Sequence, residues 1–162
     1  MRRSIESAVL ALVLAAMLAP GVAQAQSARS AGGAGRAVLP AGAAWKGIPV
    51  SGLRFGTGVT FSASGAANGA LQATLLSVPV AGVTRLIRLT GDVTAGSSPA
   101  AGPATFSGLG TLNPGDGTAV LLSVPFSLTV TAAPGGVPTL TLTLDGQTLP
   151  AAPVAAGNLV IH

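Results

Sequence analysis

The most constraining feature of this sequence is an unbroken two-residue alternation over residues 122–131. Large apolar residues occupy every second position, with Ser, Pro or Thr between them; the apolar set is Leu122, Val124, Phe126, Leu128 and Val130. Because successive side chains of a β-strand point to opposite faces, this pattern predicts a strand with one buried face. Residues 139–144 alternate Thr and Leu in the same way. No helical period of any length occurs after residue 25, so the sequence predicts an all-β body.

A second feature is an internal repeat. The letters TFS at 60–62 and LLSVP at 75–79 recur as TFS at 105–107 and LLSVP at 121–125. Each copy holds a Gly and an Asn between its two parts, which are Gly65 and Asn68 in the first copy and Gly110 and Asn113 in the second. We interpret each copy as a strand, a turn centred on the Gly and Asn, and a return strand. The sequence therefore predicts two related hairpin units, near residues 53–94 and 104–144.

Turn-forming segments separate the alternating stretches. Residues 95–103 and 133–136 are rich in Ala, Gly, Ser and Pro, and Asp145-Gly146 is a strong hairpin-turn signal. Strands at this spacing predict an antiparallel sandwich or small barrel of about 7–8 strands, built from the two hairpin units. Thr and Ser dominate the outward positions, which is typical of a soluble sheet. A transmembrane barrel would carry aromatic girdles, whereas this chain has one Trp, four Phe and no Tyr.

Two details of the predicted strands concern packing. After Leu75 the apolar parity switches to Leu76, Val78 and Val80, which predicts a bulge or a change of face. Gly56 and Gly58 stand at outward positions, where a missing side chain lets another segment approach closely or allows the long strand to bend. Several inward positions also hold small residues, namely Ala73, Gly91, Gly108 and Gly110. Small inward residues either leave a cavity or let two sheets approach closely.

Residues 1–25 have the order of a secretory signal peptide. Arg2 and Arg3 precede an apolar run, and Pro20 ends this run before a small-residue cleavage site after Ala25. The apolar run is shorter than the roughly 18 residues that a membrane anchor needs. We therefore predict an N-terminal signal helix, cleavage after Ala25 and no integral membrane segment in the mature chain.

Residues 26–46 consist mainly of Ala, Gly, Ser and Arg. Such a segment buries too little surface to offset its ordering entropy, so we expect a flexible lead-in, followed by a single all-β domain over residues 47–162. The chain has no Cys, which agrees with bacterial export, because an exported bacterial protein need not use disulfides. The predicted location is the periplasm or the extracellular space.

The formal net charge of +4 raises the question of a polyanionic partner. Residues 47–162 carry only Arg54, Arg85 and Arg88 against three Asp, so this predicted domain is about neutral. A nucleic-acid surface needs clustered cations, usually with stacking aromatic residues, and the domain is predicted to supply neither. We expect no nucleic-acid partner. A protein or surface partner is compatible with the sequence, which does not name it.

Groups that could perform chemistry are few. The chain after residue 25 has three Asp, one His and no Glu, and these residues are Asp92, Asp116, Asp145 and His162. A catalytic His must be held by a packed shell, whereas His162 is the last residue, where fraying is usual. Asp92 is predicted to face outward, and Asp116 and Asp145 to form Asp-Gly turns. We therefore predict no catalytic, cofactor-binding or metal-binding residue, and no enzymatic activity.

Two surface features bear on binding. Asn113 and Asp116 could give oxygens to calcium, but calcium gathers about 6–8 oxygens with several carboxylates, so we interpret this loop as a hairpin turn. A row of hydroxyls is predicted on one strand face at Thr139, Thr141 and Thr143, beside Thr129 and Thr131. Such an array could contact ice or a glycan, although Thr is also the preferred residue for an exposed strand face.

These observations predict an exported, non-enzymatic β-domain that serves as a structural, surface or protein-interaction module. The alternative is a small β-barrel that carries an apolar ligand, and the small inward residues motivate it. A connected internal cavity of about 300 Å³ or more would favour the carrier. A filled interior would leave the outer faces and edges as the places for function.

Overall fold

The computed structural model describes residues 29–62, 64, 66–99, 102–132 and 135–162. The predicted signal peptide and its cleavage site lie outside these residues. The described chain contains ten strands and no helix. The strands are β1 (Arg29–Val38), β2 (Ala44–Trp45), β3 (Ile48–Phe61), β4 (Ala66–Ser77), β5 (Leu86–Ser97), β6 (Ala104–Asn113), β7 (Leu121–Thr131), β8 (Thr139–Leu144), β9 (Gln147–Thr148) and β10 (Ala152–Ile161). The predicted all-β fold is confirmed.

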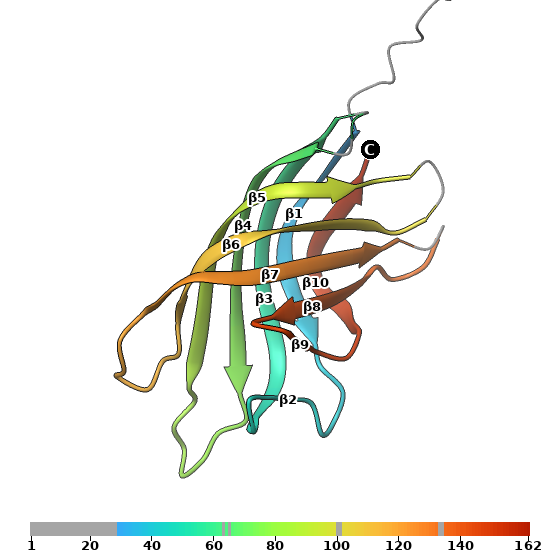
Figure 1. The fold of residues 1–162 in the computed structure, drawn as a ribbon. Helices are drawn as coiled ribbons and strands as arrows, with labels where there is room; N and C mark the ends of the chain where they lie inside the picture. The colour runs from blue at the N-terminus through green and yellow to red at the C-terminus, as the bar shows by residue number, and fades with distance from the viewer. Residues whose placement is uncertain (1–28, 63, 65, 100–101, 133–134) are drawn as a thin grey trace, which may run out of the picture.

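The strands form one antiparallel sheet that curls into a partly closed ring (Figure 1). Each strand from β3 to β8 pairs with the next, and β1 pairs with both β3 and β10. The ring is weakest between β10 and β8, which pair at only two positions. The short strands β2 and β9 are added to β3 and β8. The arrangement is barrel-like, as predicted, with a seam beside β10.

The interior is one continuous apolar core. The predicted alternation is confirmed in β7 from Val124 to Val130 and in β8 from Leu140 to Leu144, where every second residue is buried. The prediction is wrong for Leu122, which is 74% exposed, because the β6–β7 register shifts there and Ser123 has a positive φ of 55°. Phe106 on β6 has no exposed surface, and its ring lies 6.4 Å from that of Phe61 on β3. Each fully buried Leu or Phe side chain contributes about 1.5–3 kcal/mol of favourable transfer free energy. The core therefore draws on strands from both predicted hairpin units.

Three of the small inward residues leave room for neighbouring atoms. A Cβ atom added at Gly91 would lie 2.3 Å from the ring of Phe126, and one added at Gly108 would lie 1.8 Å from the carbonyl oxygen of Asp92 and 3.2 Å from the same ring. A Cβ atom added at Gly110 would lie 2.7 Å from the carbonyl oxygen of Thr90 and 2.8 Å from the side chain of Leu89. Small inward residues were predicted either to leave a cavity or to allow close approach. At these three positions they allow neighbouring atoms to approach closely.

The predicted flexible lead-in over residues 26–46 is wrong for most of its length. Residues 29–38 form β1, which pairs with β3 at ten positions and with β10 at seven. Its small residues allow backbones to approach closely, since a Cβ atom added at Gly35 would lie 2.2 Å from the carbonyl oxygen of Ala156. Its side chains bury too little surface to offset the entropy cost of ordering the segment. Backbone hydrogen bonds to a strand on each side offset this cost instead. The β-domain therefore includes β1 and β2 and does not begin at residue 47.

The two sequence repeats lie on two hairpins, β3–β4 and β6–β7, but at different points of them. In the first copy, β3 ends at Phe61 and Asn68 lies inside β4. In the second copy, Gly110 lies inside β6, and the turn comes only after Asn113. The prediction that both copies turn at their Gly and Asn is therefore wrong. Pairing with the neighbouring strands, and not the local sequence, determines where each strand ends.

The predicted parity switch at the end of β4 does not occur. Ser77 is buried there, whereas Val80 is 72% exposed. Ser77 can face inward because its hydroxyl accepts a hydrogen bond of 2.7 Å from the backbone N–H of Arg85. Val80 and Val83 then flank a tight turn at Ala81-Gly82, where both φ angles are positive (51° and 77°). Positive φ at both central residues is the geometry of a type I′ hairpin.

Two short hairpins pack together where β2 and β9 lie (Figure 1). Trp45 on β2 is buried, and its indole Nε1–H donates to the carbonyl of Leu144 over 3.2 Å. The backbone N–H of Lys46 donates to the side chain of Gln147 over 2.7 Å. The Lys46 ammonium also forms an ion pair with Asp145. The predicted Asp145-Gly146 turn is confirmed, and these contacts attach the start of β3 to the β8–β9 hairpin.

Candidate functional site

The residues considered for chemistry do not meet in one place. Asp92 faces outward on β5, Asp116 lies between β6 and β7, Asp145 lies between β8 and β9, and His162 follows β10. Asp116 and Asp145 each form an ion pair, with Arg85 and Lys46. Over the described ranges, no group of three or more His, Cys, Asp or Glu residues is placed to hold a metal ion.

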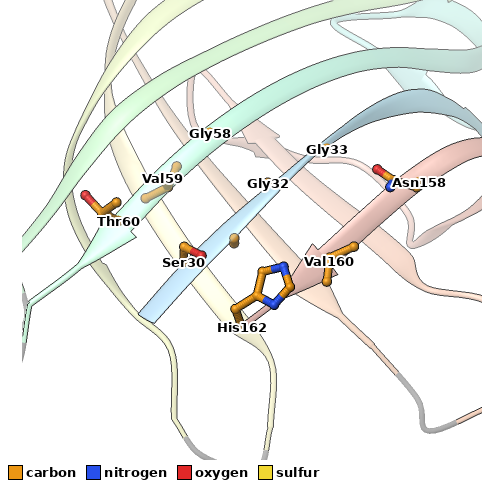
Figure 2. Close-up of a pocket in the computed structure, with 10 residues that line it drawn as sticks. Ser30, Gly32, Gly33, Gly58, Val59, Thr60, Asn158, Val160 and His162 are labelled. Carbon is orange, nitrogen blue, oxygen red and sulfur yellow. The ribbon is translucent and has the colours of Figure 1, made fainter. Parts of the chain in front are cut away.

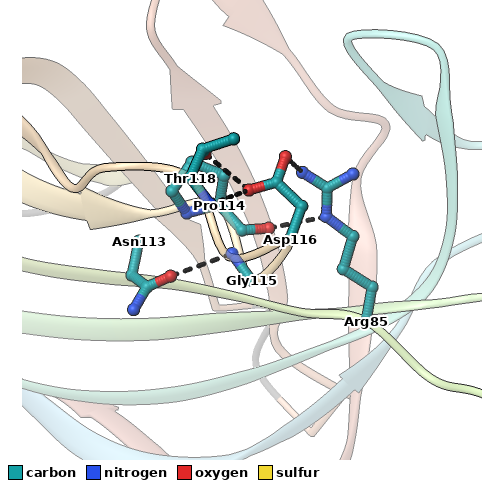
Figure 3. Close-up of polar contacts among 6 residues, drawn as sticks. All are labelled: Arg85, Asn113, Pro114, Gly115, Asp116 and Thr118. Atoms are coloured by element: carbon teal, nitrogen blue, oxygen red, sulfur yellow. Dashed lines mark hydrogen bonds and ion pairs between the residues drawn. The ribbon is translucent and has the colours of Figure 1, made fainter.

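The loop that suggested calcium uses its oxygens within the protein (Figure 3). Asp116 accepts hydrogen bonds from the backbone N–H and the hydroxyl of Thr118, over 3.0 and 2.5 Å. Its other carboxylate oxygen accepts from Arg85 over 2.5 Å, and Arg85 also donates to the carbonyl of Pro114. Asn113 accepts from the backbone N–H two residues further on. Asp116 thus stabilises a turn, as predicted, and ties it to the residue before β5.

These contacts lower the pKa of Asp116 below its ordinary value of 3.8, with the Thr118 hydroxyl as the largest cause and Arg85 as a smaller one. A depressed folded-state pKa stabilises the fold above the unfolded pKa, and this contribution is lost as the pH falls through the folded pKa. We expect the stability difference between the wild type and Asp116→Asn to shrink between about pH 5 and pH 2. Urea unfolding at several pH values measures it. The stability difference between the wild type and Thr118→Val should shrink over the same pH range. A difference that does not change with pH would contradict the assignment of the Thr118 hydroxyl as the main cause.

The predicted row of Thr hydroxyls is present on the outer face of the sheet. In the β7–β8 register, Thr129 lies opposite Thr141, and Thr131 lies opposite Thr139. Thr105 on β6 extends the row, and its hydroxyl lies 3.1 Å from that of Thr129. Hydroxyls that bond to each other are less available to a ligand, so the row offers a weak case for a binding surface.

Figure 2 shows an open hollow of about 420 Å³ on the outer face of β1, β3 and β10. Gly32 and Gly58 lie opposite each other in its floor, and a Cβ atom added at Gly58 would meet nothing within 4 Å. Ser30, Asn158 and His162 are among the polar residues that line it. His162 does not fray, because its backbone exchanges two hydrogen bonds with Ser30. The hollow lies outside the core and is not the predicted carrier cavity.

Large apolar side chains are exposed on the two connections that Arg85 joins. Val80 and Val83 flank the β4–β5 turn and are 72% and 70% exposed, and Leu122 at the start of β7 is 74% exposed. Both connections lie toward the lower end of the sheet in Figure 1. Exposed apolar side chains that cluster on a surface often mark interaction sites.

The structure also brings together three exposed arginines that the sequence did not group. Arg36 on β1 lies opposite Arg54 on β3, Arg54 lies opposite Thr74 on β4, and Thr74 lies opposite Arg88 on β5. We call Arg36, Arg54 and Arg88 the arginine row. The row is not evident from the sequence, because Arg36 lies in a segment that was predicted to be flexible. The only local sign of it is that Arg54 and Arg88 occupy outward positions of their predicted strands.

The arginine row carries an unbalanced charge. Among the described residues, Lys46 and Arg85 have carboxylate partners, whereas no ion pair involves any member of the row. Asp92 is the remaining Asp or Glu side chain of the described residues, and it lies four residues along β5 from Arg88, which is roughly 13 Å in a strand. The row is therefore the main positive feature of the outer face.

The part of the chain that the structure describes has no helix of the length and hydropathy needed to cross a membrane. Comparison with protein-family models, with curated proteins and with solved structures found no match. The molecule is thus defined by its fold, a barrel-like antiparallel β-domain, and by the surfaces described above.

Proposed function

We propose that this chain is an exported, non-enzymatic β-domain that binds a partner on its outer surface. The observation that carries the proposal is the packing of Phe126 over Gly91 and Gly108, because it assigns the small inward residues to the core and not to a ligand. The arginine row and the exposed apolar connections give the outer surface features that a partner can recognise. Export to the periplasm or beyond a bacterial cell follows from the predicted signal peptide over residues 1–25.

The absence of enzymatic activity is part of the proposal. Nucleophilic and acid–base mechanisms need groups in mutual hydrogen-bond reach. Asp116 and Asp145 are engaged in turns and ion pairs, Asp92 lies on β5, and His162 follows β10. This distribution supports a binding role over catalysis.

The second candidate is a carrier of an apolar ligand, and the hollow of about 420 Å³ favours it, since this volume is typical of ligand sites. Ligand pockets are mostly apolar and enclosed. The lining of the hollow includes Ala31, Val59 and Val160 beside its polar residues and glycines, but the hollow is open to solvent and not enclosed. Its open shape therefore supports the carrier less well than the surface-binding role.

Native mass spectrometry of the chain from residue 26 onward tests the two candidates. We expect the mass of the bare polypeptide, with no co-purified lipid or other apolar ligand, because the core is occupied by its own side chains. Uptake of a hydrophobic dye is measured in parallel. Since Val80 and Leu122 could bind dye from outside, the matched control is the Val80→Ser, Leu122→Ser variant, which keeps the core intact.

A co-purified apolar ligand, or dye uptake that persists in this variant, would support the carrier and contradict the surface-binding role. A panel of ester, glycoside and peptide substrates tests the absence of catalysis. Turnover that Asp92→Ala or His162→Ala abolishes would show the protein to be an enzyme.

A further inference from the structure

We infer that the arginine row is the binding site for an acidic polysaccharide, a linear sugar chain that carries carboxylate or sulfate groups. The site consists of Arg36, Arg54 and Arg88 on the outer face of β1, β3 and β5, with Thr74 of β4 between them. The inference rests on the proposed function, because it gives an exported surface-binding domain a surface and a partner class.

The first step is electrostatic. Arg36 and Arg54 are direct cross-strand neighbours, and like charges in that position destabilise a sheet. No carboxylate among the described residues forms an ion pair with either of them. A bound anion would convert this repulsion into two favourable contacts, because guanidinium groups bind carboxylate and sulfate-like oxygens in pairs. The arrangement is therefore complementary to an anion.

The second step is the length of the row. Neighbouring strands are about 4.8 Å apart, so Arg88 lies roughly 10 Å from Arg54 and roughly 14 Å from Arg36. A small anion bound between Arg36 and Arg54 therefore lies at one end of the row, and Arg88 stands on the strand at the other end. A ligand with anionic groups repeated along its length can engage the whole row.

The third step is the surroundings of the row. The neighbouring row of outward residues, in register across the same strands, holds Ala34, Gly56, Gln72 and Thr90. Gln72 and Thr90 are exposed and supply amide and hydroxyl groups that suit sugar hydroxyls. At Gly56 an added Cβ atom would meet nothing within 4 Å. The surface beside the charges therefore combines two small residues with two polar ones, and an extended chain can lie across it.

The fourth step separates a polysaccharide from a nucleic acid. Single strands bind through aromatic side chains on which the bases stack. The chain has one Trp and four Phe, and all five are at most 5% exposed. With no exposed aromatic platform, the row offers charge and hydrogen bonds but no stacking. These are the contacts that an acidic sugar chain uses.

The test is calorimetric titration of the chain from residue 26 onward with polygalacturonate, dextran sulfate and neutral dextran at low salt. We expect binding to at least one of the two acidic polymers, no binding to neutral dextran, and weakening as salt rises. Arg36→Gln and Arg54→Gln should each weaken binding about tenfold, the size of one charge-assisted contact. Arg88→Gln should weaken binding at least about threefold, and Arg54→Lys should retain part of the affinity.

The matched control is Lys46→Gln, which removes the same charge on β2–β3 away from the row and should change affinity less than about twofold. The Gln variants are expected to keep the wild-type melting temperature or raise it, because they relieve the Arg36–Arg54 repulsion.

Four results would overturn the inference: no binding to either acidic polymer, an equal loss of affinity in Lys46→Gln, tighter Arg54-dependent binding to single-stranded DNA, or tighter binding to anionic vesicles. Each of these leaves the mass-spectrometric test of the proposed function unaffected, so the two can fail separately.

Discussion

Replacing Phe126 with Ala is expected to lower the free energy of unfolding by about 4 kcal/mol. Phe126 is 3% exposed, and its ring covers the backbone of Gly91 and Gly108. Loss of a large core side chain costs its transfer free energy plus a cavity term, and the cavity term is largest where neighbours cannot collapse inward. Glycines have no side chain to move into the space. The expected cost is therefore near the upper part of the range for such substitutions.

Urea unfolding monitored by circular dichroism measures this change. The control is Val80→Ala, an exposed apolar residue, which should change stability by less than about 0.5 kcal/mol. Gly91→Ala alone should also be destabilising, since its Cβ atom would clash with the Phe126 ring. The same change should be better tolerated when Phe126 is already Ala. A cost below about 1.5 kcal/mol for Phe126→Ala would show that the ring does not fill this part of the core.

Local patterns were sufficient for the parts of the fold that depend on local geometry. The alternation in β7 and β8 fixes which face is buried, and Asp145-Gly146 fixes a turn, because both signals act within a few residues. The inward parity of Gly91 and Gly108 was also evident from the sequence. The sequence did not show whether these glycines leave a cavity or accept a neighbouring side chain. The answer depends on Phe126, which is distant from them in the sequence.

β1 shows why the remainder could not be predicted. Its Gly and Ala residues carry little hydrophobic signal, and its order comes from backbone pairing with β3 and β10 at the same time. The arginine row was missed for the same reason, since Arg36 and Arg54 become neighbours only through the β1–β3 register. Ser77 is a smaller example, as its burial depends on a hydrogen bond from Arg85. Each of these features is a property of non-local pairing.

Substitution by Ala is expected to affect stability very differently at two glycines of the β3–β4 pair, Gly69 and Gly58. A Cβ atom at Gly69 would lie 2.0 Å from the carbonyl oxygen of Gly58 and 2.8 Å from the Cα of Val59. Both are backbone atoms, so β3 and β4 would have to separate locally. We expect Gly69→Ala to destabilise the protein by about 3 kcal/mol, near the upper end for overpacking.

Gly58→Ala should instead be neutral or stabilising by up to about 1 kcal/mol, because Ala loses less conformational entropy than Gly in a strand. Its Cβ atom would project into the open hollow, with nothing within 4 Å. Urea unfolding of both variants gives a difference of about 3–4 kcal/mol if the β3–β4 register is correct, and near zero if it is not.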